Sequence, residues 1–224
     1  MELNEALIRI EHPPHTGTYN KNRLSPLRIL RKVALFVVIF VFSFHLSFPL
    51  GIKYLPTGLQ YLSAEFEGRQ QAIREILEVL EKHPTGLANV TKEELAEVIY
   101  EEAIRHNHDP KFILALIAIE SSFQNWSVSE QGAKGLMQIM PYVAESIAQE
   151  LGIEWSGDRT LFNPYLNIRI GIYYLSRLIL DFKDVGIALT AYNYGPTYVK
   201  GLIERKESIP PNYYHKFLTA YQNI

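Results

Sequence analysis

The chain has 224 residues, no cysteine and a net charge of −2 at pH 7. Its hydrophobic content of 47% and charged content of 21% are ordinary for a folded protein, so global disorder is not expected. The slightly acidic balance argues against a nucleic-acid partner, which normally needs a basic face. The absence of cysteine excludes disulfides, thiolate metal sites and cysteine nucleophiles.

An apolar segment near the N-terminus predicts a membrane anchor. Residues 33–50 contain no acidic residue, lysine or arginine, and with Gly51 and Ile52 they give about 20 residues, enough for a helix to cross a bilayer core of roughly 30 Å. Basic residues are frequent just before this segment and rare just after it, so the positive-inside rule places the N-terminal side in the cytoplasm. We therefore expect a cytoplasmic tail over residues 1–32 and an uncleaved, single-pass transmembrane helix over residues 33–52.

Two other interpretations of this apolar segment remain open. A cleaved signal peptide would prefer a shorter basic region and a cleavage site of small residues, and the sequence SFPLG at residues 47–51 fits such a site poorly. A buried core helix would not need so uniform an apolar run.

Residues 53–89 are predicted to form a stalk with one short amphipathic helix. Pro56 and Gly58 favour an irregular start through about Gly68. Downstream, four apolar residues recur at helical spacing on one face of residues 70–83, namely Ile73, Ile76, Leu77 and Leu80.

From residue 90 to residue 224 the pattern predicts a mainly helical domain. Three helix starts are marked by a capping residue, with a capping box in the first and proline at the first helical position in the others; they lie at Thr91, Asp109–Pro110 and Asn163–Pro164. Further helices are predicted to begin within residues 135–141 and end at Leu151, to cover VGIALTAYNY before Gly195 and Pro196, and to hold residues 213–221. No stretch alternates as a strand would.

Glu120 is the residue whose setting suggests chemistry. It follows FILALIAI, eight apolar residues in a row at 112–119. Burial in apolar surroundings raises the pKa of a carboxyl group, which is how a glutamate becomes a general acid near neutral pH, and cleavage of a glycosidic bond needs such an acid. A solvated or structural glutamate at a helix end is the open alternative.

The sequence lacks the motifs of several other common kinds of catalytic site. The sequence has no Gly-x-Ser-x-Gly elbow, no His-Glu-x-x-His and no phosphate-binding glycine-rich loop. His106 and His108 share no helical face and have no evident third ligand, so no metal site is predicted.

Four ordered blocks over about 130 residues carry a family resemblance. They are ESSF at 120–123, SEQGAKGLMQIMP at 129–141, FNP at 162–164 with NI at 167–168 and GIYYL at 171–175, and AYNYGP at 191–196. This chain thus resembles the soluble-lytic-transglycosylase-like domain, which is related in fold to goose-type lysozyme. The resemblance implies a lysozyme-like helical domain at residues 90–224 behind the transmembrane helix.

The resemblance also implies site residues. Glu120 would be the catalytic acid and then the base, and the implied substrate-binding residues are Ser129, Met137, Gln138, Tyr192 and Asn193. Ser129 and Gln138 would contact the N-acetyl group of the sugar, Met137 would line the cleft, and Tyr192 and Asn193 would bind the saccharide. As alternatives, Met137 and Tyr192 could fill the core, and Ser129 and Gln138 could cap local turns.

The C-terminal block departs from the family pattern. Residues 209–214, IPPNYY, keep the Ile-Pro pair and a tyrosine, but the Glu-Thr pair that many relatives carry is missing. Tyr213 is the tyrosine that matches the pattern and is a candidate substrate-binding residue on that ground.

The function that the resemblance implies is cleavage of the β-1,4 bond between N-acetylmuramic acid and N-acetylglucosamine in peptidoglycan, with formation of 1,6-anhydro ends. No metal or organic cofactor is required. The partners would be the glycan strands of a bacterial cell wall and the lipid around the N-terminal helix, with the catalytic domain outside the cytoplasmic membrane; the residues point to no protein partner.

Two alternative functions remain. A hydrolytic muramidase would need a second carboxylate, such as Glu130, Asp158 or Asp184, to activate water. A wall-binding protein that no longer cleaves would have no use for the acid at Glu120.

Overall fold

The computed structural model describes residue 35 and residues 55–224. The predicted cytoplasmic tail and, apart from Leu35, the predicted transmembrane helix lie outside the described residues. Among the helices of the described part, none is both long and apolar enough to cross a membrane. The chain divides into two compact units, Met1–Tyr61 and Leu62–Ile224, and the second contains all the residues of interest for the site.

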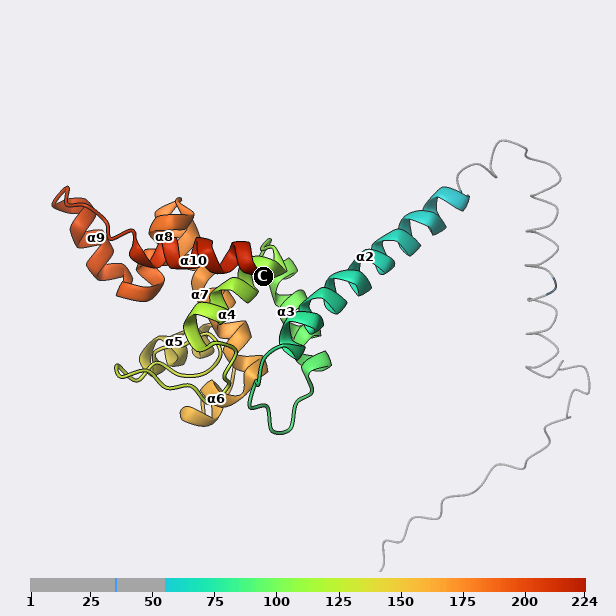
Figure 1. The fold of residues 1–224 in the computed structure, drawn as a ribbon, viewed down its shortest axis with the longest axis horizontal. Coiled ribbons are helices and arrows are strands. Elements are labelled where there is room, and N and C mark those ends of the chain that lie inside the picture. The colour runs from blue at the N-terminus through green and yellow to red at the C-terminus, as the bar shows by residue number, and fades with distance from the viewer. Residues whose placement is uncertain (1–34, 36–54) are drawn as a thin grey trace, which may run out of the picture. The chain divides into compact units, whose positions relative to one another are not determined.

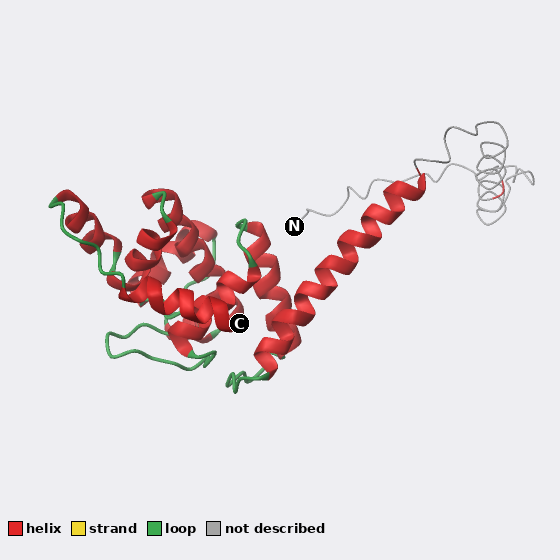
Figure 2. Ribbon diagram, turned by 45° about the horizontal axis from the view of Figure 1, so that its top comes forward, coloured by secondary structure: helices red, strands yellow, loops and turns green. Residues whose placement is uncertain are grey.

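The described part of the chain is helical, which confirms the predicted class (Figures 1 and 2). The β-type pairing in this part of the chain consists of two isolated antiparallel bridges, between Val128 and Lys134 and between Lys134 and Ile139. The helices are α2 (Leu55–Glu81), α3 (Lys92–Arg105), α4 (Pro110–Ser121), α5 (Pro141–Leu151), α6 (Asp158–Phe162), α7 (Pro164–Phe182), α8 (Val185–Tyr194), α9 (Pro196–Glu204) and α10 (Asn212–Asn223).

Capping side chains start several of these helices where the sequence predicts. Thr91 and Glu94 form a complete capping box at the start of α3. Asp109 accepts a hydrogen bond from the Lys111 amide at the start of α4, and Asn163 accepts two at the start of α7. Because these caps satisfy amides that have no partner inside the helix, they fix the first turns.

The predicted stalk differs from the structure in two ways. Helix α2 already begins at Leu55, because Pro56 falls in its first turn, where a missing N–H costs no hydrogen bond. At its other end, Ile73, Ile76 and Leu80 are buried in the hydrophobic core of the second unit. That core therefore begins upstream of residue 90.

Helix α7 is the centre of the second unit. It packs against α3, α5, α6 and α8, while α10 packs against α4 and α8. The loop between α4 and α5 runs next to α6 (Figure 1), where Lys134 pairs with Asp158 at 2.5 Å and Asn125 donates to the Phe162 carbonyl at 3.0 Å. This packing brings the end of α4, the α4–α5 loop, α8 and α10 to one place.

Candidate active site

Glu120 lies one residue before the end of α4, the most buried helix of the unit. The side chains of residues 113–117 are all in the core, and Glu120 itself is half-buried. Burial raises the pKa of Glu120 from 4.5 to about 7, against the opposing effects of a hydrogen bond from Tyr213 and the positive charge of Lys216. This agrees with the expectation from the apolar run, and a carboxyl group with such a pKa can give or take a proton near neutral pH.

Helix α10 supplies the polar partners of this carboxyl group. The Tyr213 hydroxyl donates a hydrogen bond to Oε1 of Glu120. Lys216, three residues further on the same helix face, donates from Nζ to the Ile119 carbonyl at 3.0 Å, which places its charge beside the end of α4. Burial and the charge of Glu120 hold the pKa of Tyr213 well above its usual range, so this phenol remains a donor.

Tyr192 comes to the same place from α8. Its hydroxyl donates to the Met137 carbonyl at 2.8 Å, and its side chain is buried. Burial raises the pKa of Tyr192 well above the usual range, and the nearby negative charge of Glu120 adds to this effect. Tyr192, Tyr213 and Glu120 are therefore neighbours in one site.

Met137 contributes its backbone rather than its side chain. The side chain is 0% exposed and packs against Gly171, where an added Cβ would lie 2.4 Å from the Met137 sulfur. In this structure the side chain fills the core, as the alternative interpretation has it, and does not face a cleft.

Asn167 fixes the turn that carries Met137. Its Oδ1 accepts from the Met137 amide at 2.8 Å, and its Nδ2 donates to the carbonyls of Lys134 and Leu161 at 3.0 and 2.9 Å. Gly135 has a φ of +82°, and a Cβ at that position would lie 2.2 Å from Nδ2 of Asn167. The sequence places Asn167 in a motif but assigns it no role, because the partners in the α4–α5 loop, Lys134 and Met137, are 33 and 30 residues away in the chain.

The remaining predicted contacts are placed around the α4–α5 loop and on α8. Ser129 Oγ accepts from the Ala133 amide at 3.0 Å, and Gln138 Nε2 donates to the carbonyls of Ser127 and Gly135. Both side chains thus cap turns in this structure. Asn193 is exposed, and within the described part of the chain its side chain has no hydrogen-bond partner.

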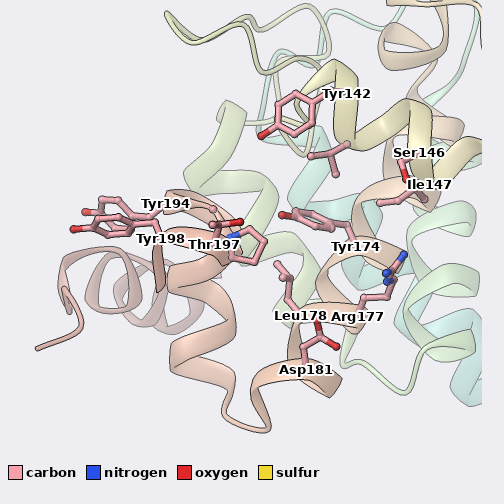
Figure 3. Close-up of a pocket in the computed structure, with 13 residues that line it drawn as sticks. Tyr142, Ser146, Ile147, Tyr174, Arg177, Leu178, Asp181, Tyr194, Thr197 and Tyr198 are labelled. Atoms are coloured by element: carbon pink, nitrogen blue, oxygen red, sulfur yellow. The ribbon is translucent and has the colours of Figure 1, made fainter. Parts of the chain in front are cut away.

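The residues drawn as sticks in Figure 3 line a cavity of about 570 Å³. The ring of Tyr174, in the middle of the cavity lining, lies 5.4 Å from that of Tyr192 and so joins the cavity to the buried site. Burial raises the pKa of Tyr174 to about 12, so its hydroxyl stays neutral. The cavity, hereafter the tyrosine cavity, is lined chiefly by Tyr142, Tyr174, Arg177, Asp181, Tyr194 and Tyr198.

Metal-binding side chains do not gather in the described residues: no three histidine, aspartate or glutamate groups there could hold an ion together. His108 is hydrogen-bonded to Ser176 at 2.8 Å, and His106 lies 4.0 Å from Glu102.

The family model of the transglycosylase SLT domain matches residues 97–214, more than half of the chain. The chain belongs to the transglycosylase SLT domain family. Glu120 and every other residue predicted for the site lie within the matched SLT domain. The buried residues of α2 and Lys216 lie outside it.

Named relatives agree with this assignment. The chain is 29% identical to a protein named membrane-bound lytic murein transglycosylase C of Actinobacillus pleuropneumoniae over 68% of its own length and 47% of the relative. It is 34% identical to membrane-bound lytic murein transglycosylase F of Desulfosudis oleivorans, over 51% of this chain and 25% of that protein. The chain thus spans about half the length, or less, of these curated relatives.

A solved structure supports the fold of the SLT domain. The 70 kDa soluble lytic transglycosylase SLT70 of Escherichia coli is similar with a TM-score of 0.50 and 27% identity, over 58% of this chain and 25% of that one. The predicted resemblance to the lytic transglycosylase family is confirmed.

Proposed function

We propose that this chain is a peptidoglycan lytic transglycosylase that cleaves the β-1,4 bond between N-acetylmuramic acid and N-acetylglucosamine. The observation that carries the proposal is the state of Glu120, a carboxyl group whose pKa of about 7 lets it both give and take a proton near neutral pH. It lies in a domain of a family whose relatives bear the name lytic murein transglycosylase.

Glu120 performs both proton transfers of the reaction. As the acid, it delivers its proton to the glycosidic oxygen, and the bond between that oxygen and C1 of the muramic residue breaks. As the base, the same carboxylate takes the proton of the muramic C6 hydroxyl, whose oxygen attacks C1 and closes the 1,6-anhydro ring. The carboxyl group ends protonated, and no water is consumed.

Tyr213 and Lys216 support the carboxylate between these two steps. The ionised carboxylate of Glu120 accepts the hydrogen bond from Tyr213 and lies near the Lys216 ammonium. Both contacts favour the charged form of Glu120. Without them the first proton transfer would leave an unsupported buried charge.

The tyrosine cavity is the proposed place for the glycan next to the scissile bond. Aromatic faces offer flat apolar surface to the C–H side of sugar rings, and phenol hydroxyls hydrogen-bond to sugar oxygens. We further propose that Ser129, Gln138, Tyr192 and Asn193 bind the sugar at the reacting centre. Met137 would act through the carbonyl that holds Tyr192.

The location of the protein is part of the proposal. Residues 33–52 would anchor the chain in the bacterial cytoplasmic membrane, with residues 1–32 inside and the catalytic domain at residues 90–224 on the outer side. The charge pattern around the apolar segment supports this, as do the relatives that are named membrane-bound.

The test is digestion of purified sacculi by the full-length chain, with mass analysis of the soluble products. Ends that lack one water relative to a reducing sugar support the transglycosylase, whereas reducing ends would mean a hydrolytic muramidase. Glu120→Gln, which can still accept the Tyr213 hydrogen bond, should abolish product formation. Glu130→Gln, a change of an exposed carboxylate on the α4–α5 loop, is the matched control and should leave activity unchanged. Full activity of Glu120→Gln would refute the assignment.

A further inference from the structure

A second cavity, separate from the candidate active site, lies between the loop after α2 and helix α6. It has a volume of about 300 Å³, and its lining includes Asn89, Trp126, Arg159 and Phe162. None of the residues proposed for catalysis or for sugar binding at the reacting centre lines it. We refer to it as the Trp126 pocket.

Trp126 is held in this pocket by a hydrogen bond and a ring contact. Its Nε1 donates to the Gly86 carbonyl at 2.6 Å, and its ring lies 5.1 Å from that of Phe162. Gly86 has a φ of +65°, and a Cβ there would lie 3.2 Å from Cδ1 of Trp126, so the backbone is closely packed against the indole edge. The indole nevertheless remains 56% exposed.

A fixed and exposed indole is a suitable surface for a sugar ring. A single exposed apolar side chain needs no explanation by itself, because such residues are common on protein surfaces. Here, however, the Nε1 hydrogen bond and the contact with Phe162 already orient the ring, so binding would cost little conformational entropy.

Two polar side chains beside the indole are available to a ligand. Both residues are exposed, and within the described part of the chain the side chain of neither Arg159 nor Asn89 makes a hydrogen bond or an ion pair. Asp158, the other charged residue of the lining, is engaged by Lys134 at 2.5 Å. A guanidinium group binds carboxylates and sugar oxygens, and an amide can both donate to and accept from an N-acetyl group.

We propose that the Trp126 pocket binds a second stretch of the glycan strand, with a sugar ring against Trp126 and its polar substituents on Arg159 and Asn89. The inference rests on the proposed function, because an acidic amino-sugar polymer is then the ligand at hand. A strand that is bound at one site is held at a high effective concentration near the other site. The pocket therefore lowers KM for long strands without changing kcat.

Fluorescence of the full-length chain tests binding directly. The sequence has two tryptophans, and Trp155→Phe leaves Trp126 as the single indole reporter. Adding soluble glycan fragments from digested sacculi to this variant, with Glu120→Gln to prevent turnover, should shift its emission to shorter wavelength as water leaves the indole. Arg159→Ala should weaken the binding about three- to tenfold. Arg205→Ala, which changes another exposed arginine that lies outside the pocket, should not weaken it.

Turnover provides the second measurement. With Glu120 intact, Arg159→Ala should raise KM for sacculi about three- to tenfold with kcat unchanged. An unchanged KM, a fall in kcat alone, or the absence of any emission change with glycan would overturn the inference. If the unsubstituted chain forms no anhydro product, the proposed function fails, but the fluorescence titration still decides whether the pocket binds glycan.

Discussion

Replacing Glu120 by glutamine should stabilise the protein, and more so at alkaline than at acidic pH. The folded chain holds the Glu120 proton with a pKa of about 7, whereas the unfolded value is 4.5. Because the folded state binds more protons between these values, the free energy of unfolding falls as pH rises through this window and stays low above it. At about 1.4 kcal/mol for each tenfold change in proton affinity, the full difference is about 3 kcal/mol.

The assay compares the free energy of unfolding of the two chains at pH 5 and pH 8. Urea unfolding in detergent micelles can be followed by the emission of Trp126 and Trp155, both of which belong to the second unit. The glutamine variant should have a higher free energy of unfolding than the unsubstituted chain, and this difference should be about 2.5 kcal/mol larger at pH 8 than at pH 5. Most of the change in proton binding by Glu120 falls between these two pH values. All other titrating groups are common to both chains, so their contributions cancel in the comparison.

A gain that is the same at both pH values would refute the reasoning. It would mean that Glu120 ionises as freely in the folded chain as in the unfolded one, and so is not poised as an acid near neutrality. Glu130→Gln, which removes an exposed carboxylate, is the control and should shift both measurements equally.

Three further substitutions test the surroundings of the acid. Lys216→Met removes a positive charge that favours the ionised form, so the fall in activity at high pH should move to higher pH, and an unchanged pH profile would contradict the electrostatic role of this lysine. Tyr213→Phe removes a hydrogen bond to a charged group, worth about 1.5–3 kcal/mol, and kcat on sacculi should fall at least tenfold; a loss confined to KM would instead indicate a binding role. Asn167→Ala leaves the Met137 amide without its partner and should lower the free energy of unfolding by about 3 kcal/mol in urea, whereas a loss under 1 kcal/mol would show that the turn holds without it.

The structure differs from the sequence prediction where packing decides local conformation. Helices α6 and α9 are absent from the predicted elements, because each is short and α9 begins with Pro196 directly after Gly195, a pair of residues that often marks the end of a helix. The helix that carries Glu120 ends at Ser121, since Ser122 and Phe123 both adopt positive φ. Phe123 is buried there, and this burial outweighs the local preference.

The sequence by itself determined the helical class and most helix starts, and it singled out Glu120, the proposed acid. Capping residues and the apolar period act over a few positions, and the apolar run before Glu120 predicts that its helix is buried. Only the tertiary structure decided which groups meet that carboxyl group. Tyr213 and Lys216 lie more than 90 residues away and reach it because α10 packs on α4, while Asn167 and Gly171 set the turn from α7. Such contacts depend on how the helices pack, and no local sequence pattern shows which residues far apart in the chain will meet.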